Sequence, residues 1–190
     1  MPATFNVDGF TSTIKEMGLA NPNKFKVDIA FPALLSSGGI HPLKQDDETL
    51  RNLSIMCETI SIAGRGVQSI LDLQYGLRRE VVYNAPVYNP ISLSFLCTSE
   101  LKEKQLLDKW NNFIVPADKN GRGFDVAYYK DYIGTITVAL LDSDGETPKY
   151  TQIYEEAYPK TVNAIELNHS TTNSTARITA DFQYAYWRPK

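Results

Sequence analysis

One stretch near the end of the chain decides the fold class: residues 176–186 read ARITADFQYAY. Apolar or aromatic residues occupy every second position from Ala176 to Tyr186, and polar residues such as Arg177 and Asp181 stand between them. Side chains alternate between the two faces of a β-strand, so this pattern predicts a strand with one buried and one solvated face.

The same alternation recurs upstream. Phe25, Val27, Ile29 and Phe31 alternate with more polar residues, which predicts a strand over 24–31. Residues 53–62 and 67–75 flank the turn 63–66 and predict a long hairpin. Further strands are expected at 79–83, 91–97, 132–141, 150–158 and 162–167. The chain is therefore expected to be mainly β, as a β-sandwich or small barrel.

One strong helix interrupts these strands, at about 99–115. Its apolar residues repeat at spacings of three and four until Pro116, and Ser99 is a candidate N-cap. The rest reads as an N-terminal arm over 1–23, with a short helical stretch at 12–17, and a long exposed loop over 32–52. We expect a single domain spanning 1–190 with one flanking α-helix.

The composition is that of an ordinary globular protein. Of 190 residues, 43% are hydrophobic and 22% charged, which argues against disorder. The 19 Lys and Arg residues do not outnumber the 22 Asp and Glu residues, so charge-driven nucleic-acid binding is disfavoured. No apolar run approaches the ~18 residues of a membrane span, and the first ten residues lack signal-peptide features, so neither membrane anchoring nor export is expected.

Catalytic chemistry is hard to assemble from this sequence. His41 and His169 stand in polar, loop-like contexts without a paired nucleophile, and Cys57 and Cys97 read as small buried side chains. The segment 142–146 (DSDGE) lacks the spacing of a calcium loop and reads as a turn. No catalytic residue, metal site or cofactor is therefore predicted, and a building block is favoured over an enzyme.

Read in order, the chain resembles the tail tube proteins of contractile-tailed bacteriophages of the T-even type. The resemblance rests on the order and spacing of short motifs over nearly the whole chain. These are 21–27 (NPNKFKV), 53–58 (LSIMCE) with Ala63-Gly64, 87–95, 108–110 (DKW), 156–160 (EAYPK), 165–167 (IEL) and 178–187. The longer loop between Phe31 and Asn52 departs from the family pattern.

The resemblance implies a structural virion protein without an active site. Hexameric rings of a β-barrel or sandwich with a flanking helix would stack into a hollow tail tube. That tube would stand on baseplate proteins inside a contractile sheath protein, with its length set by a tape-measure protein. DNA would pass through it into the host without sequence-specific binding. The subunit would be assembled in the host bacterial cytoplasm and end in the virion.

The resemblance also leads to two sets of candidate residues. Solvent-facing positions of the expected hairpin would line the lumen, although they fit an ordinary solvated sheet face equally well: Ser54, Glu58, Gln68, Asp72 and Gln74. Apolar residues of the segment 2–19 and the loop 32–52 would make contacts between rings: Phe5, Phe10, Ile14, Met17, Leu34, Leu35 and Ile40. Deleting residues 2–19 is expected to leave a folded subunit that cannot polymerise.

Three other functions remain open from the sequence. The first is a tube protein of a type VI secretion or other contractile injection system, which would carry protein effectors. The second is a carbohydrate-binding β-sandwich, to which the eleven tyrosines could contribute. A hydrolase is a distant further alternative.

Overall fold

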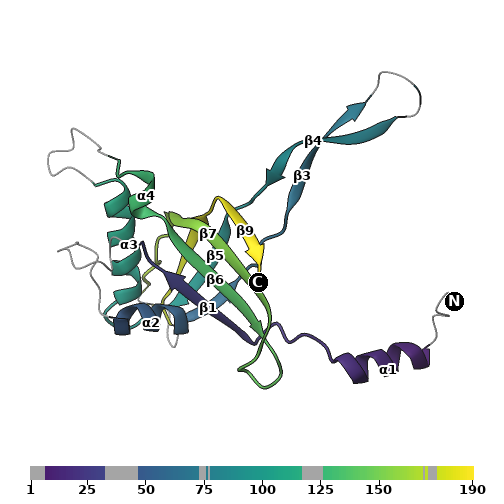
Figure 1. The fold of residues 1–190 in the computed structure, drawn as a ribbon. Helices are drawn as coiled ribbons and strands as arrows, with labels where there is room; N and C mark the ends of the chain where they lie inside the picture. Colours follow the sequence, from purple (N-terminus) through teal and green to yellow (C-terminus); the bar gives the residue numbers. More distant parts are fainter. Residues whose placement is uncertain are drawn as a thin grey trace.

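The computed structural model of the chain describes residues 7–32, 47–72, 76, 78–116, 126–168, 170 and 175–190. These residues form a β-sheet body from which a hairpin and an N-terminal helix project (Figure 1). In chain order the elements are α1 (Val7–Met17), β1 (Phe25–Ala30), α2 (Asp47–Ile55), β2 (Cys57–Ile60), β3 (Gly66–Asp72), β4 (Arg79–Val87), β5 (Ile91–Leu96), α3 (Lys102–Ile114), α4 (Tyr129–Tyr132), β6 (Gly134–Leu141), β7 (Pro148–Val162), β8 (Arg177–Gln183) and β9 (Tyr186–Pro189).

The body is one antiparallel sheet that bends at its longest strand. The strand order is β1-β6-β7-β8-β5-β2, and β9 also pairs with β7. The first part of β7 pairs with β6 and β9, whereas its last residues pair with β8. The register against β6 shifts near Glu156, which has a φ of +57°. A bulge of this kind bends a strand, so β7 turns from one half of the sheet into the other.

The alternation of residues 176–186 builds the core. Ile178, Ala180 and Phe182 of β8 are fully buried. They lie opposite Phe95, Leu93 and Ile91 of β5, respectively, and these three are equally buried. Facing residues of an antiparallel pair share one face of the sheet, so the two strands form a continuous apolar layer. The predicted mainly β fold is confirmed.

Helix α3 flanks the sheet, as predicted, and closes one end of the core. Leu106, Leu107 and Trp110 are buried at helical spacing. The ring of Trp110 lies 4.6 Å from that of Phe31, and its Nε1–H donates a hydrogen bond of 2.9 Å to the carbonyl oxygen of Tyr132.

The start of α3 differs from the expected Ser99 cap. The N-cap residue is Leu101, which has no side-chain capping hydrogen bond. Instead, the buried Glu103 carboxylate accepts hydrogen bonds of 3.0 Å from the backbone N–H and the hydroxyl of Thr98. The Glu103 carboxylate therefore holds the backbone at Thr98, just before the helix begins. This contact stands in place of the side-chain cap that was expected from Ser99.

The predicted hairpin of 53–62 with 67–75 is wrong in both its first strand and its pairing. Helix α2 continues to Ile55 and buries Leu53, so a strand begins only at Cys57. Strand β2 pairs with β5, and β3 pairs with β4. Alternation indicates which residues share a face but does not select the partner strand, and the distant β5 supplies the buried apolar layer.

Two further boundaries differ from the expected ones. The predicted loop 32–52 is helical from Asp47, because its charged cluster supplies polar and acidic residues that suit a helix start; residues 33–46 lie outside the described residues. The expected strand 150–158 is confirmed within the longer β7, which ends at Val162, but the expected strand 162–167 is wrong, because residues 163–167 are not in a strand. The bulge at Glu156 lets one strand serve two sheet neighbours, which a short period-two pattern does not reveal.

Candidate assembly surfaces

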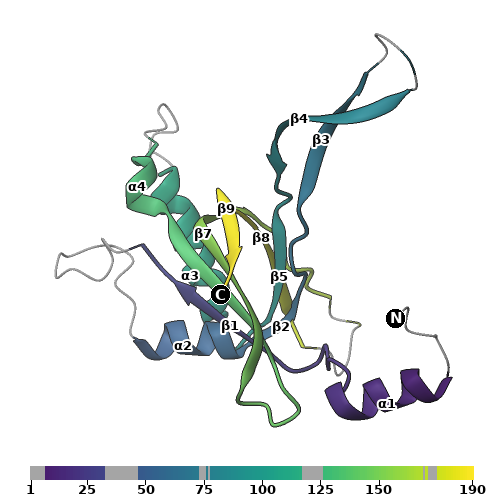
Figure 2. The same ribbon diagram turned by 45° about the vertical axis from the view of Figure 1, so that its right-hand side comes forward.

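Among the described residues, the projecting hairpin formed by β3 and β4 carries the largest group of exposed large apolar side chains. Figure 2 shows that it extends away from the body as a two-stranded ribbon. Cross-strand side-chain contacts hold its two strands together. Gln68 and Asn84 share a hydrogen bond of 2.8 Å, Ser69 donates to Glu80 at 3.1 Å, and Arg79 pairs with Asp72 at 3.0 Å.

Both faces of the projecting hairpin carry exposed apolar side chains. Ile70 faces Val81 on one side, and Val82, opposite Ser69, lies on the other. Tyr83 and Val82 are 63% and 58% exposed. An isolated two-stranded hairpin is only marginally stable in water, and large exposed apolar patches mark interaction sites. The projecting hairpin therefore has the chemistry of a segment that is covered on both faces by other protein.

Sequence reasoning missed this surface. It assigned β3 to a different hairpin and treated the strand at 79–83 as part of the sheet. The signal was present in residues 79–87 (REVVYNAPV), where Val81, Val82 and Tyr83 are consecutive apolar residues. Consecutive positions of a strand face opposite sides, so such a run indicates apolar side chains on both faces.

Helix α1 is a second projecting element. Val7 and Phe10 are 76% and 56% exposed, and Ile14, one turn further on, is half-buried. Residues at this spacing share one face of a helix, so α1 presents an apolar stripe. Phe10 and Ile14 were predicted as contact residues between rings, and Met17 ends the helix. Phe5, Leu34, Leu35 and Ile40 lie outside the described residues.

The structure places the candidate lumen residues on separate elements. Ser54 lies in the last turn of α2 and Glu58 on β2 in the body. Gln68 and Asp72 lie on the projecting hairpin, and Gln74 is outside the described residues. The four described residues therefore do not share the one hairpin that was expected to carry them, because β2 pairs with β5 and β3 pairs with β4.

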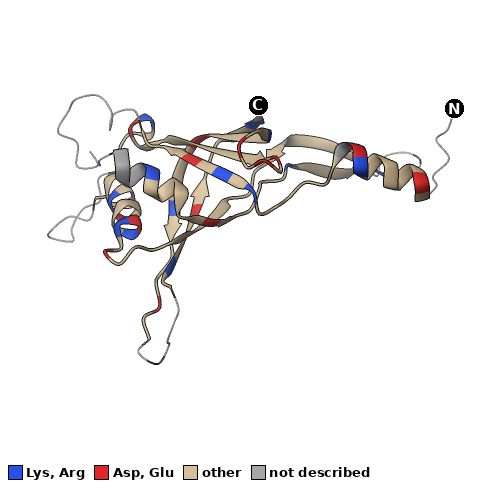
Figure 3. Ribbon diagram, turned by 90° about the horizontal axis from the view of Figure 1, so that it is seen from below, with Lys and Arg blue, Asp and Glu red and all other residues tan. Residues whose placement is uncertain are grey.

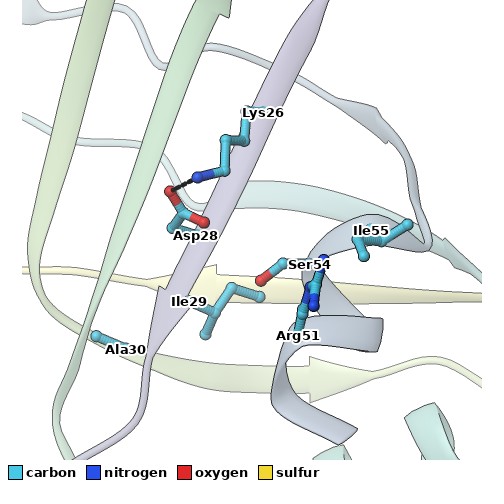
Figure 4. A pocket seen from close by; sticks show the side chains of 7 residues that line it. All are labelled: Lys26, Asp28, Ile29, Ala30, Arg51, Ser54 and Ile55. Atoms are coloured by element: carbon cyan, nitrogen blue, oxygen red, sulfur yellow. Dashed lines mark ion pairs between the residues drawn. The ribbon is translucent and has the colours of Figure 1, made fainter. Parts of the chain in front are cut away.

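Ser54 lines a cavity of about 520 Å³ between β1 and α2 (Figure 4). Lys26 and Asp28 form an ion pair of 2.9 Å on its β1 side, and Arg51 faces them from α2. Among the described residues, the seven that line this cavity include no His or Cys, so they supply no pair of nucleophile and neutral base.

Glu58 is held by a bidentate ion pair across the sheet. Arg177 of β8 donates hydrogen bonds of 2.6 and 3.2 Å from Nε and Nη2 to the two carboxylate oxygens. The hydrogen bond from Arg177 is the main reason why the pKa of Glu58 lies below its usual value. The carboxylate therefore stays ionised and neutralises the guanidinium beside it.

Other basic side chains on the strands are also paired with carboxylates. Figure 3 shows acidic and basic positions close together along the ribbon. Among the described residues, three more basic residues of the main sheet lie within 3.0 Å of a carboxylate: Lys26 with Asp28, Lys149 with Asp142, and Arg188 with Glu155. Pairing of this kind leaves little net positive charge to attract phosphates.

Two features of the described residues concern metal-binding and thiol chemistry. They contain no group of three His, Cys, Asp or Glu side chains placed to hold a metal ion. Burial raises the pKa of the Cys57 thiol to about 12, so the reactive thiolate is scarce at neutral pH. His41 and His169 lie outside these residues. Within the described part, no helix has the length and apolar character of a membrane span.

Comparison with known proteins agrees with this architecture. A sequence model of the family described as phage tail tube protein matches residues 20–190. No curated protein sequence matches the chain. The fold is similar to a chain in the sheath–tube complex of an extracellular contractile injection system in its extended state. That chain has a TM-score of 0.62 and 15% identity, with 95% of this chain and 97% of the other covered.

Two further solved structures show the same fold. A chain in the baseplate of the anti-feeding prophage has a TM-score of 0.59 and 13% identity, and the match covers 90% of this chain and 95% of that one. A chain in a sheath/tube terminator of an extracellular contractile injection system has a TM-score of 0.59 and 14% identity, with coverage of 90% and 96%.

Proposed function

Because the chain belongs to the phage tail tube protein family, we propose that it is the subunit of the inner tail tube of a contractile-tailed phage of the T-even type. Hexameric rings of the subunit stack into a hollow tube inside the contractile sheath. The tube is a passive conduit through which DNA leaves the virion and enters the host cell. Its role depends on shape, and it requires no active site.

The projecting hairpin is the observation that carries this proposal. Its exposed apolar residues lie on both faces, so one neighbour on one face would leave the other face in water. A ring closed by rotation joins two different patches of each subunit, and such a heterologous contact accommodates a hairpin inserted into its neighbour. Burial of the hairpin between copies removes its apolar surface from water and covers its two open edges.

Contacts between stacked rings are assigned to the N-terminal arm and to the loop 32–52. In α1 the apolar stripe of Phe10 and Ile14 is the described part of that surface. A helix of 11 residues is too short to be stable alone in water, so a partner surface that covers this stripe would stabilise it. Phe5, Met17, Leu34, Leu35 and Ile40 complete the proposed set.

A conduit for DNA must not retain it. We assign Glu58 to the lumen, where its ion pair with Arg177 would prevent the guanidinium from binding phosphate. Ser54, Gln68, Asp72 and Gln74 remain proposed lining positions wherever assembly exposes them to the channel. In this role the subunit also contacts sheath, baseplate and tape-measure proteins and resides in the virion after assembly in the bacterial cytoplasm.

A tube of another contractile injection device is the second candidate function. The similarity to chains from extracellular contractile injection systems favours it, since those structures are named as sheath–tube, baseplate and terminator assemblies. Both functions need the same rings and differ only in cargo. Sheath and tape-measure genes beside a capsid gene would support the phage tail, and effector genes without a capsid gene would support the injection device.

Assembly of purified protein tests the proposal. We expect the wild-type chain to form rings or tubes in negative-stain micrographs, and Val82→Asp to abolish them while its circular dichroism and melting temperature stay near wild type. Leu167→Asp is the matched control, because Leu167 is 84% exposed but lies outside the projecting hairpin. A wild-type chain that forms no rings at any concentration, or Val82→Asp rings equal to wild type, would contradict the proposal.

A further inference from the structure

The projecting hairpin joins the body through two short connectors. Residues 61–65 lead into β3, residues 88–90 lead from β4 into β5, and neither connector is part of a strand. A ribbon attached by two such connectors is free to pivot unless side chains hold its base. The direction of the hairpin therefore depends on what the connectors contact.

The first connector is tied to β7 by buried polar groups. The backbone N–H of Ala63 donates a hydrogen bond of 3.0 Å to the hydroxyl of Tyr154. That hydroxyl donates in turn to Oε1 of Gln152 at 2.6 Å. Tyr154 is fully buried and Gln152 is 2% exposed, so these contacts anchor the connector at residue 63 to the core.

Beyond this anchor, Arg65 joins both connectors to the C-terminal strand. Its guanidinium carbon lies 4.8 Å from the ring centroid of Trp187 in β9 and 5.9 Å from that of Tyr88 in the second connector. The indole Nε1–H of Trp187 points to the carbonyl oxygen of Gly64 at 3.4 Å. A planar guanidinium stacks on aromatic rings in a way that an ammonium does not. We call Arg65, Tyr88 and Trp187 the base clamp.

The base clamp is continuous with the core. The ring of Tyr88 lies 5.8 Å from that of Tyr184, and Tyr184 lies 5.0 Å from Tyr154. Strand β9 is itself held by pairing of residues 186–189 with residues 152–155 of β7. The first connector is therefore fastened to Tyr154 of β7 through Ala63, and Tyr88 of the second connector reaches the same tyrosine through the ring of Tyr184.

We propose that Arg65 is a positioning residue that fixes the direction of the projecting hairpin before assembly, through its stack on Trp187 and Tyr88. The direction of the hairpin in the free subunit does not depend on the proposed function; only the expected effect on ring formation rests on that function. A hairpin held in one direction meets its neighbour without an additional loss of conformational freedom, so ring formation is faster and occurs at lower subunit concentration. The C-terminal strand β9 thereby sets the geometry of a segment more than a hundred residues earlier in the sequence.

The test measures hairpin direction in the unassembled subunit. Spin labels at Val82→Cys on the hairpin and Lys160→Cys on the body, in a Cys57→Ala, Cys97→Ala background, report their distance distribution by pulsed electron paramagnetic resonance. Arg65→Ala should broaden this distribution at least twofold, and Arg65→Lys, which keeps the charge, should broaden it by an intermediate amount. Arg79→Ala is the matched control, since Arg79 belongs to the same hairpin and pairs with Asp72 away from the base.

The consequence for assembly is measured on the same substitutions without labels. The subunit concentration at which half the chains enter rings should rise about tenfold for Arg65→Ala and remain near wild type for Arg79→Ala. An unchanged distance distribution in Arg65→Ala would overturn the role of Arg65, whatever the assembly result. A broadened distribution in a chain whose wild type forms no rings would support the base clamp and contradict the proposed function, so the two failures are distinguishable.

Discussion

The ring of Tyr184 lies edge-on against the ring of Tyr154, with 5.0 Å between the centroids, but the two hydroxyl groups differ in their hydrogen bonding. The Tyr154 hydroxyl donates to Gln152 and accepts from Ala63. Among the described residues, the Tyr184 hydroxyl is buried without a hydrogen-bond partner. An unpaired buried polar group destabilises the folded state, so the same substitution should have opposite effects at the two positions.

Tyr184→Phe should stabilise the subunit. It removes the unpaired hydroxyl and keeps the ring that packs against Tyr154 and Tyr88. We expect the free energy of unfolding to rise by about 1 kcal/mol in urea titrations followed by circular dichroism. A loss of stability would show that the hydroxyl has a partner in solution.

Tyr154→Phe should destabilise the subunit by about 1–3 kcal/mol in the same titration. It leaves the Ala63 N–H without its hydrogen bond to Tyr154 and removes the donor to the buried Gln152 side chain. Equal changes in the free energy of unfolding for Tyr184→Phe and Tyr154→Phe would contradict the difference in hydrogen bonding between the two hydroxyl groups.

Gly134→Ala should be among the most damaging single-methyl changes. A Cβ at Gly134 would collide with the carbonyl oxygen of Ala30 and approach the Trp110 ring at 3.3 Å. The clash is with backbone of the paired strand β1 and not with a flexible side chain, so a loss of about 2 kcal/mol or more is expected. Gly66→Ala is the control, because its Cβ would meet Val87 only at an ordinary 3.9 Å. Similar melting temperatures for the two variants would be inconsistent with the close approach.

The turn between β6 and β7 should lose stability in acid. The hydroxyl of Thr147 and the backbone N–H groups of Glu146 and Thr147 donate to Asp144 and lower its pKa from 3.8 to about 2. A carboxyl with a lowered folded-state pKa contributes its full stabilisation above pH 4, and this contribution disappears as the pH falls toward 2. Asp144→Asn should therefore show a flatter decline of unfolding free energy from pH 5 to pH 2. If the unfolding free energy of Asp144→Asn declines with pH as steeply as that of wild type, Asp144 does not cause the loss of stability in acid.

Glu58→Gln should make assembled tubes retain DNA. The substitution leaves Arg177 without its carboxylate partner, and one additional phosphate contact raises the salt dependence of binding by about one unit of slope. Co-sedimentation of tubes with DNA at several salt concentrations measures this slope. The double variant Glu58→Gln, Arg177→Gln should return to wild type. An equal salt dependence of DNA binding for wild type, Glu58→Gln and the double variant would contradict the assignment of Glu58 to the lumen.

The fold class and the core were predictable because they depend on local periodicity. The alternation around Ile178 and Phe182 marks a half-buried strand, and the spacing of Leu106, Leu107 and Trp110 marks the helix. The pattern is confirmed for Ile178, Ala180, Phe182 and Tyr184, which are buried, but it is wrong for Tyr186, which is 46% exposed and begins the separate strand β9. The resemblance of ordered motifs also gave the family that the sequence model identifies over residues 20–190.

Strand pairing and the assembly surfaces were not predictable from the same signal. Strand β2 pairs with β5 more than thirty positions later, and period-two patterns carry no information about such a partner. The base clamp joins Arg65 to Trp187, which lie far apart in the sequence, so no local motif predicts this contact. The apolar run of Val81, Val82 and Tyr83 was visible, but its meaning depends on the isolation of β3 and β4 from the body.

A cryo-electron microscopy reconstruction of the assembled protein tests the central claim most directly. We expect closed rings of six subunits in which β3 and β4 of each copy are buried against a neighbour, with Val82 and Tyr83 out of contact with water. A tube in which the hairpin stands free in solvent, or a protein that remains a single subunit under every assembly condition, would contradict it.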